Sequence, residues 1–285
     1  MSERLCLFVR IPDKGFTHGG KFHADDVFSA ALLRYLNPNI VIQRGFAVPD
    51  GFDGIVFDIG LGRFDHHQKG SPVRENGVPY AAFGLLWREV GVPLLGERDA
   101  KRFDEGFIQP LDQDDNTGCG NQIAGIIAAY NPLWDQPRDP DECFAEAVDF
   151  ALGVLEKKFA VFFAVQRAAE FVSAALAKAK DGIVLMDRFA PWKQRLIPSR
   201  AQFVVFPSQR GGWCAEAIPR TFGTQELRVP FPAPWAGAAE EELPALSGIE
   251  TLRFCHTGRF MVTTGTKEDA LAACHAAKTW SEAEG

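Results

Sequence analysis

The sequence lacks several features that mark common classes of protein. Its six cysteines are scattered and form no Cys-x-x-Cys pair, which argues against a structural zinc site and a disulfide framework. No run approaches the roughly 18 consecutive apolar residues of a membrane-spanning helix. Residues 1–10 hold only a short apolar run, unlike a secretory signal. These absences favour a cytoplasmic protein with reduced thiols and no membrane partner.

Basic stretches and nucleotide-binding loops are also missing. The formal net charge is −7 and there is no basic run, which disfavours a broad grip on long nucleic acid. Binding of a strand end or a short oligonucleotide stays open. The chain has no Gly-x-Ser-x-Gly motif for serine hydrolysis and no P-loop for ATP. Zinc deaminase chemistry would need the paired cysteines that the chain lacks.

The spacing of apolar residues predicts an α/β protein in two parts. Near the N-terminus it predicts a strand ending at residue 17, a helix at 25–36 and strands at 40–42 and 54–57, which suggests a partly parallel sheet flanked by helices. Further helices are expected at 81–90, 100–114, 122–130 and 141–180. Strands are expected at 183–186, 202–206, 213–218, 252–255 and 260–263, before a helix at 267–277. We place a domain boundary near residue 181, which gives domains 1–180 and 181–285, the second smaller and α+β.

Histidines and acids gather in two short segments of the first part. Thr-His-Gly-Gly-Lys-Phe-His-Ala-Asp-Asp at 17–26 contains His18, His23 and Asp25, and Phe-Asp-His-His-Gln at 64–68 contains His66 and His67. Imidazole and carboxylate are ligands that manganese and zinc accept. Two glycines between His18 and His23 allow a tight turn that brings both imidazoles toward Asp25. We interpret these segments as a metal site built for hydrolysis.

Other candidates have simpler alternative explanations. Asp58 follows a predicted buried strand, where ligands gather in α/β sheets, but it equally suits a strand-end turn. Asp25 could be only a helix cap. Three acids in Leu-Asp-Gln-Asp-Asp-Asn at 111–116 could donate a further carboxylate or form a solvated turn. His256 and Arg259, in a predicted hairpin turn, could bind a phosphate or lie idle on the surface.

These residues resemble the DHH phosphoesterase superfamily, named for its Asp-His-His motif. The chain is most similar to the bacterial members of the MYG-one exonuclease family, known only as metal-dependent hydrolases. The matching segments lie at 17–26, 57–60, 64–68, 111–116, 131–134, 191–193 and 247–256. The resemblance implies a DHH-like metal-binding catalytic domain at 1–180, including a long helical linker, and a substrate-binding domain at 181–285.

The resemblance also implies a dinuclear site with two divalent ions, usually Mn²⁺, with Zn²⁺ or Mg²⁺ as alternatives. One ion would be held by His18, His23 and Asp58. The other would be held by Asp25, Asp58 and a carboxylate of the 112–115 cluster, for which Asp112 and Asp115 are the candidates and Asp114 is left open, with His66 completing the shell. His67 would face the phosphate, and His256, Arg259 and Lys69 would bind substrate.

The expected activity is a 3′→5′ exonuclease on single-stranded RNA or a short oligonucleotide end, by metal-assisted phosphodiester hydrolysis. In this mechanism His66 and His67 serve the reaction directly. Two alternatives remain: a small-molecule phosphoesterase or pyrophosphatase acting on phosphorylated nucleotides at the same site, and a non-enzymatic metal-binding protein. Whether the aliphatic helix at 141–180 packs within the chain or in a homo-oligomer is left open.

Overall fold

The computed structural model describes residues 10–284, and the chain separates into two compact units, Met1–Phe162 and Phe163–Gly285. The expectations for the N-terminal run and for Cys6 fall on residues outside those described. Within residues 10–284 the cysteines are free thiols. The division between the two units falls within helix α6 (Pro140–Ala177), which therefore contributes residues to both. The expected boundary near residue 181 follows the end of this helix.

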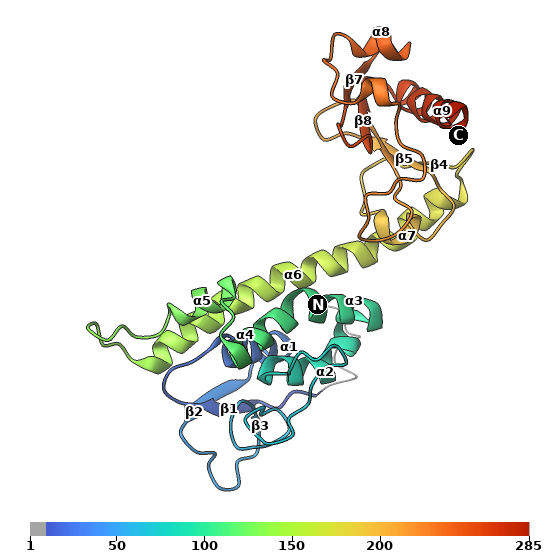
Figure 1. The fold of residues 1–285 in the computed structure, drawn as a ribbon. Helices are drawn as coiled ribbons and strands as arrows, with labels where there is room; N and C mark the ends of the chain where they lie inside the picture. Colours follow the sequence, from blue (N-terminus) through green and yellow to red (C-terminus); the bar gives the residue numbers. More distant parts are fainter. Residues whose placement is uncertain (1–9, 285) are drawn as a thin grey trace. The chain divides into compact units, whose positions relative to one another are not determined.

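The first unit is built on a small parallel sheet. Among the described residues, strands β1 (Lys14–His18), β2 (Val41–Gly45) and β3 (Ile55–Val56) form it in the order β2-β1-β3. All pairs are parallel, so the carboxyl ends of the strands meet at one edge. Helix α1 (Ala24–Leu36) connects β1 to β2, and the helices of this unit lie on one side of the sheet (Figure 1). The α/β class is therefore confirmed, while the two-domain DHH fold stays a prediction.

Aromatic packing holds the helices of the first unit together. Helix α2 (Ala82–Leu95) contributes Phe83, which stacks on Phe28 of α1 at 5.5 Å between ring centroids. Trp87, also in α2, lies 5.9 Å from Phe159 of α6. These rings are buried, and burial of each large side chain stabilises the fold by about 1.5–3 kcal/mol. The first half of α6 is thereby fixed against the unit that carries the candidate site.

The helix expected at 100–114 is interrupted. The chain forms α3 (Glu97–Phe103), a π-helical turn (Asp104–Ile108) and α4 (Gln109–Thr117), followed by α5 (Gln122–Ala128). Pro110 has no N–H to donate to the carbonyl four residues earlier, which favours a local change in helical hydrogen bonding. The wider turn resets the side-chain directions of α4, which carries the acids at 112–115.

The second unit contains a mixed sheet. Its strands are β4 (Ile183–Leu185), β5 (Phe203–Pro207), β6 (Trp213–Ala217), β7 (Leu252–Cys255) and β8 (Met261–Thr264), in the order β4-β5-β6-β8-β7. Helices α7 (Lys193–Leu196), α8 (Leu243–Ser247) and α9 (Lys267–Glu284) accompany it, with a 3₁₀ turn at Ala233–Trp235. Helix α9 packs against this sheet through buried residues such as Ala270 and Cys274. The expected hairpin of residues 252–264 is present as β7 and β8.

Helix α6 is unusually apolar for its exposure. It contains an 18-residue window with a mean hydropathy of 1.5, of which 17% is buried, so its length and composition would suffice to cross a membrane. The sequence analysis looked for uninterrupted apolar runs and found no candidate membrane span, because Arg167 and Glu170 interrupt the apolar run of α6. A single helix that meets these two criteria is weak evidence for a membrane span, so membrane insertion does not follow.

Candidate metal centre

The carboxyl edge of the parallel sheet and the start of α1 bring the first group of candidate side chains together. His18 ends β1, and residues 19–20 turn the chain back so that His23 occupies the N-cap of α1. Asp25 and Asp26 lie in the first helical turn, where the helix dipole favours carboxylates. The Asp26 carboxylate accepts a hydrogen bond from the His23 backbone N–H at 2.9 Å. The cap is therefore His23, and Asp25 does not serve as one.

Asp58 occupies a restricted backbone conformation directly after β3. Its φ is +56°, in the left-handed region that non-glycine residues rarely adopt. The Asp58 N–H donates to the carbonyl of Phe64 at 2.9 Å, which joins the strand end to the Asp-His-His segment. The Asp65 carboxylate then accepts hydrogen bonds from the backbone N–H groups of Leu61 and His67. This loop closure directs His66 back toward Asp58.

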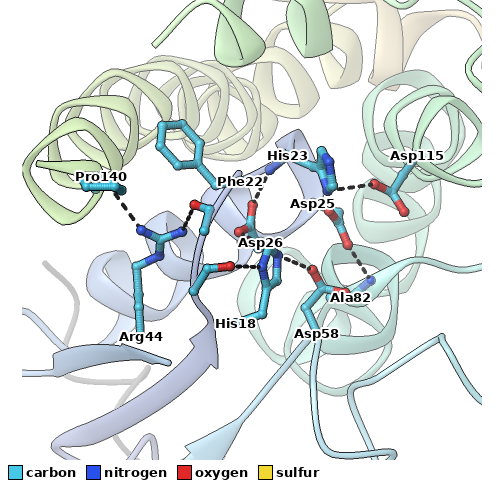
Figure 2. Close-up of polar contacts among 12 residues, drawn as sticks. His18, Phe22, His23, Asp25, Asp26, Arg44, Asp58, Ala82, Asp115 and Pro140 are labelled. Atoms are coloured by element: carbon cyan, nitrogen blue, oxygen red, sulfur yellow. Dashed lines mark hydrogen bonds and ion pairs between the residues drawn. The ribbon is translucent and has the colours of Figure 1, made fainter. Parts of the chain in front are cut away.

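Figure 2 shows that His18, His23, Asp25, Asp26, Asp58 and Asp115 converge on one place. His18 Nε2 lies 3.1 Å from Asp26 Oδ2 and 3.2 Å from Asp58 Oδ2. His66 lies between Asp58 and Asp115, with Nδ1 3.3 Å from Asp58 Oδ1 and Nε2 3.0 Å from Asp115 Oδ2. Asp58 is therefore shared between the two histidines.

Two further histidines sit at the accessible side of the cluster. His23 Nδ1 is 4.0 Å from Asp115 Oδ1, and about half of its side chain is exposed. His67 Nδ1 is 2.8 Å from Asp65 Oδ1 and 3.5 Å from Asp58 Oδ1. Its side chain is 57% exposed. These two imidazoles leave the cluster open to a ligand from solvent.

Apart from the ion-pair contacts within the cluster, several of its donor atoms are buried without a hydrogen-bond partner among the described residues. They are Asp25 Oδ1, Asp26 Oδ2, Asp58 Oδ1 and His66 Nδ1. An unsatisfied buried polar atom is costly, and more so for a charged group. A divalent cation accepts such oxygen and nitrogen donors and offsets the negative charge of several carboxylates at once. The donor set therefore fits bound metal ions.

The protonation equilibria of the cluster show how closely its charges interact. Burial lowers the pKa of His18, but the carboxylates of Asp26 and Asp58 outweigh it and raise this pKa to about 10. For His66, Asp115 and Asp58 likewise outweigh burial and raise the pKa to about 10. Burial raises the pKa of Asp58, but the two histidines oppose it and bring the pKa down to about 2. Without a cation, protons on the histidines therefore balance the carboxylates.

Asp25 is the most strongly perturbed acid of the group. Burial, reinforced by the neighbouring carboxylates of Asp58 and Asp115, raises its pKa well above the ordinary value. Burial also raises the pKa of Asp26, although His18 opposes it. Acids held this close together in a buried place require a counter-charge to ionise. Perturbed groups of this kind cluster at functional sites.

The donors form three sets that could each hold an ion, two of which share Asp58. One joins His18, Asp26 and Asp58, another joins His23, Asp25 and Asp115, and the third joins Asp58, Asp65, His66 and His67. The sequence pairs His18 with His23 around one ion, whereas the structure pairs His18 with Asp26. Asp26 and Asp65 are the donors that the sequence expectation omits. Both acids could have been found from the sequence, because each lies directly beside an expected ligand.

Of the two acids expected from the 112–115 cluster, the structure places Asp115 at the histidines and Asp112 elsewhere. Asp112 Oδ2 accepts from the guanidinium of Arg74 at 2.7 Å, and Oδ1 accepts from the Gly84 N–H at 3.2 Å. The two acids are three residues apart on α4, and the Asp112 side chain is engaged by the segment that follows the Asp-His-His motif. A direct role of Asp112 as a ligand has no support in these contacts.

Arg74 fastens this segment to the helix that carries Asp115. Its buried guanidinium also donates to both oxygens of Asp104, at 2.6 and 3.0 Å, and to the carbonyl of Pro79 at 3.1 Å. The ring of Tyr80 lies 3.9 Å from the guanidinium carbon. Arg74 thus joins the loop of residues 72–80, the π-helical turn and α4 in one ion-pair network.

Arg44 has a similar supporting place at the first motif (Figure 2). Its side chain is 3% exposed. It donates to the carbonyls of Gly20 and Pro140, at 2.8 and 3.2 Å, and to Asp141 at 2.8 Å. The glycine turn is therefore tied to both β2 and the start of α6.

The expected substrate-binding residues do not all belong to this unit. Lys69 is exposed, two residues after His67. His256 and Arg259 form the turn between β7 and β8 in the second unit. His256 Nδ1 accepts from the Gly258 N–H at 2.9 Å, its ring packs on Phe260, and the Arg259 guanidinium donates to the carbonyl of Phe231. Their roles toward a substrate stay predictions.

Comparison with known proteins places these observations in a family. The model of the MYG1 exonuclease family, described as an uncharacterised protein family (UPF0160), matches residues 15–277. The chain is 26% identical to a MYG1 protein of Dictyostelium discoideum, over 90% of this chain and 93% of that protein. It is 26% identical to the human MYG1 exonuclease, over 93% and 85%, and 28% identical to a MYG1 protein of Chlamydia pneumoniae, over 93% and 96%. No solved structure matches the chain significantly.

Proposed function

Because the chain belongs to the MYG1 exonuclease family, we propose that it is a metal-dependent phosphodiester hydrolase. Membership in a family whose relatives include proteins named exonuclease supports a nuclease-type hydrolase activity. The observation that carries the metal dependence is the buried cluster of Asp25, Asp26 and Asp58, in which one carboxylate oxygen of each acid has no hydrogen-bond donor among the described residues apart from the histidine contacts of the cluster. Such a cluster is expensive to bury unless a cation offsets its charge.

We propose two ions, with Mn²⁺ as the first choice and Zn²⁺ or Mg²⁺ as alternatives. Asp58 is the natural shared ligand, because its two oxygens face His18 and His66 separately. His18 and Asp26 would complete one side, and His66, Asp25 and Asp115 the other. When bound, a pair of ions lowers the pKa of an attacking water and offsets the charge that develops on the phosphoryl oxygens.

The protein's own groups supply orientation and a proton. Asp65 Oδ1 lies 2.8 Å from His67 Nδ1, which places the proton of the neutral ring on Nδ1 and orients the imidazole. The second ring nitrogen, Nε2, then is the atom that can hydrogen-bond the phosphate or, in the imidazolium form, deliver a proton to the leaving oxygen. His67 is exposed enough to meet a substrate from solvent.

The names of the relatives and the overall charge of the chain support a proposal for the substrate class. We propose 3′→5′ removal of nucleotides from single-stranded RNA or short oligonucleotides in the cytoplasm. An acidic chain without a basic run suits recognition of a strand end more than a long tract. Lys69 in the first unit, and His256 and Arg259 in the second, are the proposed phosphate contacts.

The test is degradation of a 5′-labelled single-stranded RNA by the purified full chain with Mn²⁺, compared with Asp58→Asn. We expect a ladder of products shortened from the 3′ end, lost on chelation and in the variant. Cleavage of dinucleotides or pyrophosphate alone would favour a small-molecule phosphoesterase. Metal-dependent thermal stabilisation without any turnover would indicate a binding protein and would contradict the proposal.

A further inference from the structure

A large aromatic side chain stands in solvent beside the candidate metal centre. Phe46 is 88% exposed, which is unusual for an apolar ring of this size. It follows β2 directly, and the last residue of that strand, Gly45, pairs with His18 of β1. Phe46 therefore leaves the sheet at the same edge as the first candidate ligand.

The glycine turn of the first motif brings the ring close to the cluster. The Gly19 N–H donates to the Gly45 carbonyl at 2.7 Å. A Cβ on Gly20 would lie 3.4 Å from Phe46 Cε1, so the ring rests against the backbone of the turn. Gly20 follows His18 by two residues, a reach of at most about 7 Å along the chain. That reach is comparable with the length of one nucleotide.

The support under the ring is fixed. Gly20 has a φ of +80°, which glycine adopts without strain. Its carbonyl accepts from the buried guanidinium of Arg44 at 2.8 Å. The backbone beside the ring is therefore held in place, and most of the ring surface is open. An exposed aromatic ring is a platform on which unstacked bases stack.

The glycine turn against which the ring lies is followed by a cationic residue. Lys21 follows Gly20 and is exposed, in a chain whose net charge is −7 and whose sequence has no basic run. An ammonium beside an aromatic ring offers the two contacts that a single-stranded nucleotide needs, one for its phosphate and one for its base. The polar neighbours Lys21 and His23 suit a nucleotide better than the apolar surface of a protein partner.

We propose that Phe46 and Lys21 form a nucleotide subsite at the metal centre, in which the Phe46 ring stacks on a base and the Lys21 ammonium contacts a phosphate. The proposal rests on the proposed phosphodiester hydrolysis and names how the strand end is held. Stacking on any base is sequence-tolerant, so the subsite gives affinity for single strands without base specificity.

The experiment measures binding of a fluorescein-labelled single-stranded RNA oligonucleotide and its cleavage, using the full chain and the variants Phe46→Ala, Phe46→Leu and Phe46→Trp. We expect Phe46→Ala and Phe46→Leu to weaken binding and raise KM by about 5- to 150-fold, and Phe46→Trp to retain both values. The number of Mn²⁺ ions bound should stay the same in all three. Lys21→Gln should reduce the salt dependence of binding by about one phosphate contact.

Two controls separate base stacking from other effects. Val41→Ala removes another exposed side chain from the opposite end of β2, 63% exposed, and should change nothing. An oligonucleotide with abasic nucleotides at its 3′ end should bind the wild type and Phe46→Ala equally. Equal binding of the normal oligonucleotide by Phe46→Ala and Val41→Ala would overturn the proposal.

Different results would refute the proposed hydrolysis and the proposed subsite. A wild-type protein that binds the oligonucleotide without cleaving it would refute the proposed hydrolysis, and the loss in Phe46→Ala would still report the subsite. A protein that cleaves RNA with an unchanged KM in Phe46→Ala would refute the subsite alone.

Discussion

Removal of Arg74 is expected to destabilise the first unit, because Arg74 neutralises two acids from inside the fold. The residue is 7% exposed and its guanidinium contacts Asp104 and Asp112 at 2.6 and 2.7 Å. Breaking a buried ion pair by deleting one partner costs about 3–5 kcal/mol, since the other charge stays buried. We take the lower end for Arg74→Ala, because the stranded Asp112 can accept a proton.

The pH dependence gives this prediction a second readout. Burial raises the pKa of Asp112 to about 7, while Arg74 opposes the rise. Between its ordinary value and 7 the folded state holds more protons than the unfolded state, so the contribution of Asp112 to stability falls as pH rises through this window. Without Arg74 the folded-state pKa rises further. The loss in Arg74→Ala should therefore be larger at pH 8 than at pH 5.

The assay is thermal unfolding of wild type and variants at the two pH values, together with Mn²⁺ affinity. A loss of about 3 kcal/mol corresponds to a fall in Tm of roughly 6–12 °C for a unit of this size. The double variant with Asp112→Asn should recover part of the fall at pH 8. Arg138→Ala, which breaks an exposed pair with Glu146, is the matched control. A Tm of Arg74→Ala no lower than that of the control would refute the reasoning.

Two further predictions concern a glycine and the histidines of the cluster. Gly84→Ala should destabilise the protein, because its Cβ would lie 1.9 Å from Asp112 Oδ2. Gly153→Ala in α6 brings its Cβ near no other atom and should stabilise the protein by up to about 1 kcal/mol. Changes in Tm of the same sign for the two variants would contradict this prediction. Mn²⁺ binding at pH 7 should release protons from His18 and His66, whose pKa values are raised to about 10. Calorimetry in buffers of different ionisation enthalpy measures this, and heats that do not depend on the buffer would count against it.

Local signals allowed much of the first motif to be predicted from the sequence. A short apolar strand, a glycine turn and acids in the first helical turn all specify β1, the turn and α1 within neighbouring residues, and the structure has these elements. The position of Asp26 beside His18 was not predicted. It depends on side-chain directions at the N-cap of α1, which spacing alone does not resolve.

Long-range features could not be predicted in the same way. The Arg74 network joins residues 30 and 38 positions apart, and nothing near Arg74 in the sequence marks it as buried. The contact between Asp112 and Arg74 was not predicted for the same reason, since Arg74 lies outside the helix that carries Asp112. The π-helical turn of Asp104–Ile108 reflects Pro110 and tertiary packing together. The strand order β6-β8-β7 likewise depends on pairing across the second unit.

We propose that the cluster of histidines and acids around Asp58 holds two metal ions, with the Asp58 carboxylate shared between them. The most direct test is electron paramagnetic resonance of the full chain titrated with Mn²⁺, with Asp58→Asn as the comparison. We expect the wild type to bind two Mn²⁺ ions per chain and to give a spin-coupled spectrum, as for ions about 3.5–4 Å apart. We expect Asp58→Asn to lose the coupling. Absence of bound Mn²⁺, or a spectrum of isolated ions that Asp58→Asn leaves unchanged, would contradict it.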